Sequence, residues 1–186
     1  MPKIKVNGIN LYYESHGQGF PIIFTHGFTA SHAMWQPQDS ALSKEYQFIT
    51  YDARGHAESD SPPTSAQYSA DISVEDMYQL TRALHIKKAV IGGLSMGGYI
   101  SLRFGLKHPD ITSALIIMDT GPGYRNPARM QEWNNSQEMR AKRLETEGIG
   151  FMLAEKRTES SREIMLKHNP IGLANMGRNV VAQHDS

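Results

Sequence analysis

The chain has 186 residues, enough for one well-packed domain with a sizeable apolar core. Nineteen basic residues balance nineteen acidic ones, so no overall field draws the protein to nucleic acid or to an anionic membrane, and a neutral small molecule fits best as substrate. The absence of cysteine excludes disulfides, thiolate catalysis and cysteine-based metal centres, and we expect neither a metal nor a cofactor. No stretch approaches the length of a membrane span and the first ten residues lack an apolar core, so we expect a cytoplasmic protein.

The opening residues alternate between apolar and polar side chains on both sides of Asn7-Gly8. Asn-Gly between two such stretches is a strong signal for a two-residue turn of type I′, which predicts a β-hairpin. Four short apolar runs follow, and each ends in a loop; they are residues 21–27, 46–56, 88–95 and 111–119. Runs of this kind are typical of strands buried on both faces, which indicates a parallel sheet.

Two helices are predicted between these strands. The first covers residues 73–86, where Ser73 followed by Asp76 resembles a capping box, and its apolar stripe consists of Val74, Met77, Leu80 and Leu84. The second runs through MGGYISLRFGLK and is closed by His108-Pro109. This alternation predicts an α/β fold with a mostly parallel sheet and right-handed crossover helices.

From Gly121 onward the sequence holds no convincing strand. It is rich in Met, Glu, Arg and Lys at helical spacing, so residues 126–186 are predicted to form several helices with solvated charged faces and packed methionines. We therefore divide the chain into a core, residues 1–121, and a helical segment, residues 122–186.

Residues 93–97 read Gly-Leu-Ser-Met-Gly and lie between an apolar strand and a helix. In such a turn the serine takes a strained backbone conformation, and the glycines let strand and helix pass without a Cβ collision. The strain points Ser95 Oγ into a crevice at the carboxyl end of the strand, where the N-terminus of the following helix favours negative charge. The pattern predicts Ser95 as a nucleophile; a glycine-rich turn with an incidental serine is the simpler alternative.

The segment THGF, residues 25–28, ends an earlier strand. The oxyanion formed in acyl transfer needs two preorganised donors, and the backbone N–H groups of Met96 and Phe28 are the candidates. His26 is a candidate base, but a histidine in such a turn more often braces loops through hydrogen bonds.

Together with YDARGHAES, residues 51–59, these motifs resemble the α/β-hydrolase superfamily, in particular its single-domain esterases, lactonases and cofactor-free haloperoxidases. The resemblance covers residues 1–120 well and extends loosely over the helical segment, which is similar to the family's cap. It implies a loop-ordering role for Asp52, Arg54 and His56. The sequence departs from the family pattern at Ala57, where glycine is usual.

A serine nucleophile needs a histidine base that is oriented by a carboxylate. In the family that the chain resembles, the acid and the histidine follow the serine on loops after the last two strands. Nothing after residue 120 resembles those strands, so the resemblance implies a hydrolase truncated before them, with an incomplete sheet.

Within the chain, Asp119 is the best candidate acid because it ends a strand, with a turn or helix-cap aspartate as the alternative. His184 is the candidate base because a C-terminal histidine can fold over Ser95, although the adjacent Asp185 cannot easily orient it. A partner chain is a third source of these groups. Weaker candidates for the base are His56, His108 and His168.

A sheet that ends at residues 112–118 leaves that strand as an edge with unpaired N–H and C=O groups and uncovered apolar faces. We therefore expect a homo-oligomer, with domain swapping as one of its forms.

The function expected from these residues is that of a serine hydrolase acting on small carboxylic esters: Ser95 attacks, Phe28 and Met96 hold the oxyanion, and water hydrolyses the acyl-enzyme. Lactone hydrolysis and perhydrolase-type haloperoxidation use the same serine and stay open. Because no aspartate stands at the nucleophile position, the resemblance disfavours epoxide hydrolase and haloalkane dehalogenase chemistry. The alternative from another class is a catalytically impaired fragment that binds or assembles without turnover.

Overall fold

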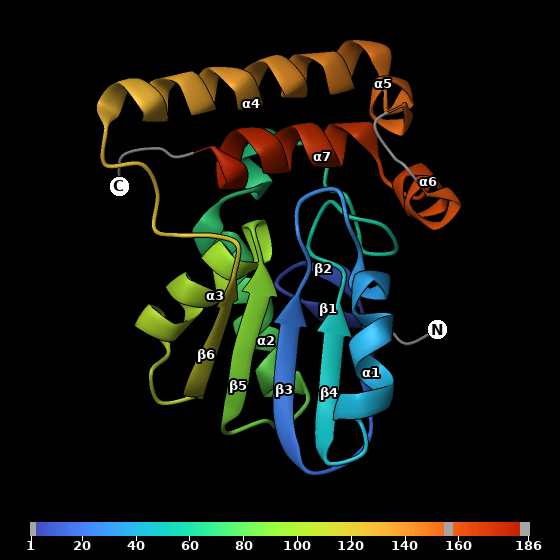
Figure 1. The fold of residues 1–186 in the computed structure, drawn as a ribbon, viewed down its shortest axis with the longest axis vertical. Helices are drawn as coiled ribbons and strands as arrows, with labels where there is room; N and C mark the ends of the chain where they lie inside the picture. The colour runs from blue at the N-terminus through green and yellow to red at the C-terminus, as the bar shows by residue number, and fades with distance from the viewer. Residues whose placement is uncertain (1–2, 155–157, 183–186) are drawn as a thin grey trace.

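The computed structural model describes residues 3–154 and 158–182, and its centre is a twisted sheet (Figure 1). The strands are β1 (Lys3–Val6), β2 (Ile9–His16), β3 (Phe20–Thr25), β4 (Tyr46–Tyr51), β5 (Ala89–Leu94) and β6 (Thr112–Met118). Their order in the sheet is β1-β2-β4-β3-β5-β6; the pairs β4-β3, β3-β5 and β5-β6 are parallel and the two pairs made by β2 are antiparallel. The predicted α/β fold with a mostly parallel sheet is confirmed.

The N-terminal hairpin forms as the Asn-Gly pair predicts. Asn7 and Gly8 both have positive φ angles, 43° and 79°, as a type I′ turn requires. The register pairs Val6 with Ile9 across the turn, and both side chains are buried. The four predicted apolar runs correspond to the strands β3, β4, β5 and β6.

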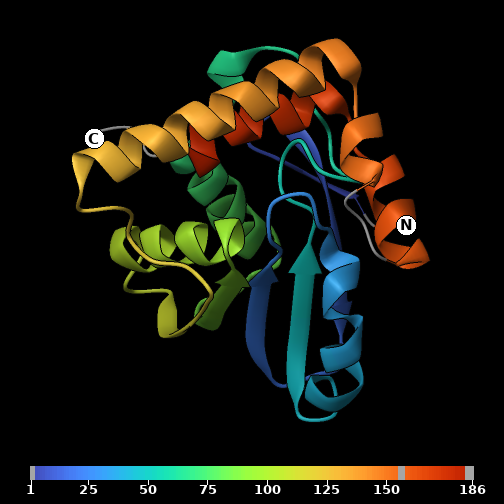
Figure 2. The same ribbon diagram turned by 45° about the horizontal axis from the view of Figure 1, so that its top comes forward.

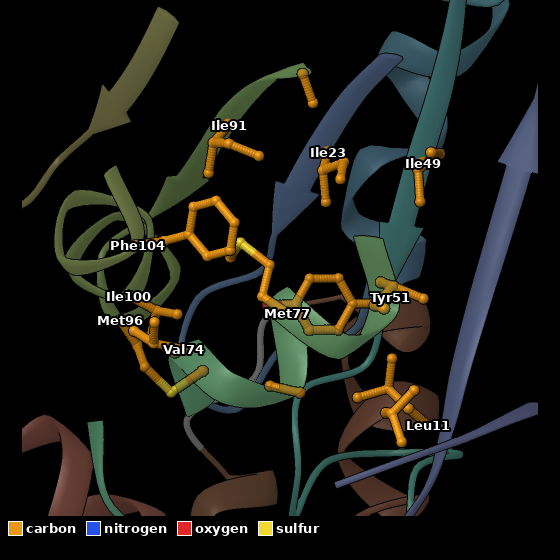
Figure 3. Close-up of a cluster of buried hydrophobic side chains, with 14 of the residues drawn as sticks. Leu11, Ile23, Ile49, Tyr51, Val74, Met77, Ile91, Met96, Ile100 and Phe104 are labelled. Atoms are coloured by element: carbon orange, nitrogen blue, oxygen red, sulfur yellow. The ribbon is translucent and has the colours of Figure 1, made fainter. Parts of the chain in front are cut away.

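Helices cover the two faces of the sheet unequally. The helices are α1 (Gln36–Leu42), α2 (Ala70–Ala83), α3 (Met96–Lys107), α4 (Pro127–Glu147), α5 (Gly150–Leu153), α6 (Glu159–Leu166) and α7 (Pro170–Met176), with the shorter turns η1 (His32–Trp35), η2 (Ser65–Gln67) and η3 (Gly177–Val181). α2 and α3 build the main core on one face, where Met77 and Phe104 pack with Ile23, Ile49 and Ile91 of the strands (Figure 3). On the other face Trp35 and α1 cover a smaller cluster.

The helix expected over residues 73–86 begins earlier than predicted. The Ser69 hydroxyl accepts a hydrogen bond from the Ile72 amide at 3.0 Å, which caps α2 one turn before Ser73. Ser73 is buried inside the helix, and the Asp76 carboxylate pairs with Arg54 at 2.7 Å. The predicted start at Ser73 is therefore wrong, because Ser69 takes the capping role and the tertiary ion pair takes Asp76.

The helical segment lies across the carboxyl ends of the parallel strands, with α4 and α7 side by side in both views (Figure 1, Figure 2). Helices were predicted for this part of the chain, and its described residues contain no strand. Its own apolar cluster includes Leu144, Met165 and Leu173, but Met176 and Val180 belong to the main core beneath. The segment is thus tied to the sheet by shared packing.

β6 is an edge strand in the part of the chain that the structure describes, since it pairs with β5 alone. Leu115 and Ile116 are 40% and 39% exposed, values that are high for apolar residues of a sheet. The predicted uncovered edge is present; the association expected from it stays a prediction.

Candidate functional site

The turn between β5 and α3 holds Ser95 in a strained conformation. Ser95 has φ 51° and ψ −114°, a backbone conformation that residues other than glycine rarely adopt. The residue is exposed. Its own amide donates to the Met118 carbonyl of the neighbouring strand at 2.9 Å, which fixes the turn against β6. The hydroxyl therefore projects from a rigid corner at the carboxyl edge of the sheet.

Glycines around Ser95 are required by contact with neighbouring backbone. A Cβ at Gly93 would lie 2.5 Å from the Gly97 carbonyl carbon, and a Cβ at Gly97 would overlap the Thr25 carbonyl. Both obstacles are backbone atoms, which cannot swing aside as a long side chain can. The steric explanation for this motif is confirmed.

A cavity of about 80 Å³ opens beside the Ser95 hydroxyl. Its described lining residues come from the turn, the segment after β6 and the helical segment; they are Ser95, Met96, Tyr99, Thr120, Gly121, Trp133, Val180 and Val181. None of them carries a charge. The Trp133 indole N–H donates to the Val181 carbonyl at 2.9 Å, which joins α4 to η3 at the cavity wall.

The cavity residues contributed by the helical segment were not predicted from the sequence. Trp133 is one of only two tryptophans in the chain, which was the available signal. Helical spacing alone did not indicate that it faces Ser95, because that depends on how α4 crosses the sheet.

The loop after β3 brings the Phe28 amide close to this turn. A Cβ placed on Gly27 would lie 3.9 Å from Ser95 Cβ, so the Gly27-Phe28 peptide is next to the serine. Among the described residues, neither the Phe28 nor the Met96 amide has a hydrogen-bond acceptor. No described residue therefore competes for these two backbone N–H groups.

His26 braces loops, as expected, and does not act on Ser95. Its Nε2 accepts from the Ala53 amide at 3.0 Å, so its Nδ1 carries the proton and donates to the Gly27 carbonyl at 2.8 Å. Burial lowers the pKa of His26 to about 4, against the opposing effect of the Asp52 carboxylate. The ring is therefore neutral and both its nitrogens are occupied.

The motif at residues 51–59 orders loops, as the resemblance implied. Asp52 is buried and accepts from the His32 amide at 2.7 Å and from His32 Nδ1 at 2.8 Å. Burial, the largest single effect, would raise the pKa of Asp52, but the hydrogen bonds from His32 and the attraction of nearby imidazoles together hold that pKa below its usual value. Arg54 reaches back to the buried Asp76 of α2 through Nε at 2.8 Å and Nη2 at 2.7 Å.

The predicted acid and base are not joined to Ser95 by any described contact. Asp119 is exposed at the end of β6 with φ 46°, and no hydrogen bond links it to Ser95 or to a described histidine. His184 lies outside the described residues. The described residues that line the cavity with Ser95 include no histidine and no carboxylate.

Within the described ranges, no group of three or more His, Asp or Glu side chains is arranged to hold a metal ion. Among the same residues, no helix has both the length and the apolar character that a membrane span requires.

Comparison with known proteins agrees with this arrangement. A family model described as the alpha/beta hydrolase fold matches residues 21–175. The chain belongs to the α/β-hydrolase family. The resemblance carried by the three motifs is thereby confirmed.

Among curated proteins, this α/β-hydrolase is similar to an AB hydrolase superfamily protein of Bacillus subtilis, with 32% identity over 119 residues that cover 62% of the chain and 44% of that protein. It is 39% identical over 85 residues to 3-oxoadipate enol-lactonase 1 of Acinetobacter baylyi, which covers 46% of the chain and 31% of that enzyme. The chain spans less than half the length of these curated relatives.

Solved structures match the α/β-hydrolase over nearly all of its length. A malate-bound thermophilic esterase from Thermogutta terrifontis has a TM-score of 0.85 and 30% identity, covering 97% of this chain and 72% of its own. An enol-lactonase from Burkholderia xenovorans has a TM-score of 0.84 and 25% identity, covering 97% and 74%. These two neighbours are an esterase and an enol-lactonase.

Proposed function

We propose that this α/β-hydrolase cleaves small carboxylic esters through an acyl-enzyme on Ser95. One observation carries the proposal: an exposed serine with a positive φ angle stands beside two backbone amides that have no acceptor among the described residues. An unpaired donor pair next to a nucleophile is the arrangement that stabilises an oxyanion.

In the proposed reaction, Ser95 Oγ attacks the ester carbonyl carbon and its proton passes to a base. The Phe28 and Met96 amides donate hydrogen bonds to the ester carbonyl oxygen as it becomes negative. Because the fold already holds both amides in place, no reorganisation is needed at this step. Collapse of this intermediate breaks the ester bond and releases the alcohol, which takes up the proton. Water then attacks the acyl-serine and releases the carboxylic acid.

The cavity favours a short, uncharged acyl group. Its volume is about 80 Å³, and its described lining offers apolar surfaces from Met96, Trp133 and Val180 with no cation to pair with a carboxylate. Burying an unpaired charge there would be costly.

The acid and the base stay predictions. Asp119 and His184 are the candidates within the chain, and a partner chain is the other source. If Asp119 and His184 are triad members, Asp119→Asn and His184→Asn should each lower kcat by about 10³-fold or more. The two variants are assayed separately on the same ester. A loss below about tenfold would contradict that role.

The experiment that tests the proposed function compares p-nitrophenyl acetate turnover and fluorophosphonate labelling in the wild type and in Ser95→Ala. We expect Ser95→Ala to lose both labelling and at least about 10³-fold of kcat. Ser101→Ala is the matched control, because Ser101 lies on α3, which Ser95 precedes, is fully buried, and has no hydrogen-bond partner for its hydroxyl among the described residues. Equal turnover in Ser95→Ala and the wild type would favour a binding or assembly module without catalysis.

Lactone hydrolysis is a second candidate, favoured by similarity to enol-lactonases in both sequence and structure. It would use the same serine and the same amides, and the product would stay in one piece as a hydroxy acid. Parallel assays with p-nitrophenyl acetate and γ-butyrolactone distinguish the two, and Ser95→Ala must abolish whichever activity is found. Perhydrolase-type haloperoxidation by the same serine stays open.

We also propose that the protein is located in the cytoplasm. In addition, we propose that it self-associates through the β6 edge. The exposed Leu115 and Ile116 support association, because an uncovered edge strand readily pairs with another chain. Size-exclusion chromatography at high concentration is expected to show a dimer or larger species, and a clean monomer would contradict this.

A further inference from the structure

Three buried histidines form a row beside the loop that carries Phe28. The ring centroids of His26 and His56 are 4.9 Å apart, and those of His56 and His168 are 5.2 Å apart. The rings come from separate parts of the chain: the end of β3, the loop after β4, and the corner between α6 and α7. All three are at least 96% buried.

Each ring of this row contacts a backbone group of residues 27–30. His26 Nδ1 lies 2.8 Å from the Gly27 carbonyl, the Thr29 amide donates to His56 Nε2 at 3.3 Å, and His168 Nε2 lies 3.0 Å from the Ala30 carbonyl. Thr29 has φ 63°, a conformation that a β-branched residue rarely adopts without support. The three imidazoles therefore fix the backbone on both sides of the Phe28 amide.

His168 differs from the other two because both of its nitrogens face carbonyl oxygens. Nδ1 lies 2.8 Å from the Ile164 carbonyl of α6, and Nε2 faces Ala30, which is 138 positions away in the sequence. Burial lowers the pKa of His168 despite these carbonyls, so the ring is neutral at neutral pH and has one N–H to donate. Only the Nε2–H tautomer bonds to the loop.

We propose that His168 is a positioning residue, whose Nε2–H holds the Ala30 carbonyl and so ties the α6–α7 corner to the loop that presents the Phe28 amide. This inference rests on the proposed function, in which that amide stabilises the oxyanion. The helical segment then acts on the reaction in two ways, by lining the cavity and by setting the direction of one donor.

A purely space-filling role for His168 does not explain its contacts. Among the described residues, His168 Nε2 is the sole possible donor within hydrogen-bond distance of the Ala30 carbonyl. A side chain of similar size without a donor would leave that oxygen without a protein partner, and a shift of the loop to satisfy it would move the Phe28 amide. The bond thus constrains direction as well as volume.

The test compares two amide substitutions that differ in reach. The amide nitrogen of His168→Gln can occupy the place of Nε2 and bond to Ala30, whereas the shorter amide of His168→Asn reaches only the place of Nδ1 and bonds to Ile164. We expect His168→Asn to lower kcat about tenfold with KM unchanged, less than the loss on removing a whole oxyanion donor, and His168→Gln to stay within about threefold of the wild type. His16→Asn, at an exposed histidine on β2, is the control for the substitution itself.

A second readout does not depend on catalysis. Amide hydrogen exchange at Thr29 is expected to be about tenfold faster in His168→Asn than in the wild type, and unchanged in His168→Gln, since that amide is protected by the same loop conformation. If Ser95→Ala retained full turnover, the proposed function would fail while this measurement still tested the tie to the loop. Identical kcat and exchange in both variants, whether unchanged or equally altered, would overturn the proposal, because the Ala30 bond would then make no difference.

Discussion

The loop after β3 and the segment after β6 leave the same edge of the sheet on opposite sides of Ser95, yet they are held very differently. Residues 26–30 are buried or half-buried, and three histidines bond to their backbone. Residues 119–126 are exposed apart from the half-buried Thr120. Both contribute to the site: the first places an amide, and the second supplies Thr120 and Gly121 to the cavity wall.

This difference shows where the fold is preorganised. Groups that must point at a developing charge gain from a rigid setting, because no reorganisation is then needed during the reaction. The side of Ser95 that faces β3 has this rigidity, whereas Asp119 on the β6 side is exposed. The candidate site is therefore rigid for its donors and open on the side where the acid was predicted.

The largest expected effect comes from crowding the rigid side. Gly97→Ala would place a Cβ against the Thr25 carbonyl, and we expect it to lower the free energy of unfolding by about 4 kcal/mol or more. Gly121→Ala, in the segment after β6, meets no atom within 4 Å and is expected to change it by less than about 0.5 kcal/mol. Urea unfolding measures both, and similar values for the two variants would remove the distinction between the loops.

The second-largest expected effect is a loss of folding stability at acid pH, caused by the three histidines on the rigid side. Burial lowers the pKa of His26, His56 and His168, so the folded protein keeps these rings neutral while the unfolded chain protonates them near pH 6.5. Their stabilising contribution is present above pH 6.5 and is lost as the pH falls below it. Between pH 7 and pH 5 we expect His26, with its folded pKa of about 4, to account for a loss of about 2 kcal/mol, and His56 and His168 to add to that loss.

His32 contributes with the opposite sign to the three-histidine row, whereas burial also lowers the pKa of His108, outside that row. For His32, burial, the largest single effect, would lower the pKa, but the hydrogen bond to Asp52 and the negative charges of Asp52 and Glu14 together raise it. The contribution of His32 is therefore complete below pH 6.5 and is lost as the pH rises through the folded value. Urea unfolding at pH 7 and pH 5 measures the balance, and His168→Gln should make the loss smaller because it removes one of the titrating rings. Equal or greater stability at pH 5 would contradict the assignment of neutral rings.

The sequence was sufficient for the parts of this comparison that rest on local sterics. Gly93 and Gly97 predicted the turn at Ser95, because a strained serine between a strand and a helix needs small neighbours. Asn7-Gly8 predicted the hairpin for a similar reason. In both cases the cause lies within a few residues of the feature, so a short pattern contains the information.

Features that depend on distant contacts were not predicted. His168 was considered only as a weak candidate base, since nothing in its neighbourhood indicates that it bonds to Ala30. The start of α2 was placed at Ser73 because the Arg54–Asp76 pair, 22 positions apart, was not visible in the pattern. Trp133 was missed for the same reason: the crossing of α4 over the sheet decides what it faces.

The smallest expected effect concerns Ala57, which stands where the family usually has glycine. Ala57 has φ 39°, a left-handed conformation that costs a residue with a Cβ about 1–2 kcal/mol. Ala57→Gly removes that strain but adds freedom to the unfolded chain, so we expect a net gain of up to about 1 kcal/mol in urea unfolding. Ala83→Gly makes the same change at the exposed end of α2 and is expected to be destabilising by up to about 1 kcal/mol. Equal losses of stability in the two variants would contradict this expectation. The hydrogen bonds around Asp52 would then compensate for the strain at Ala57 completely, and this loop would be less strained than its backbone angles indicate.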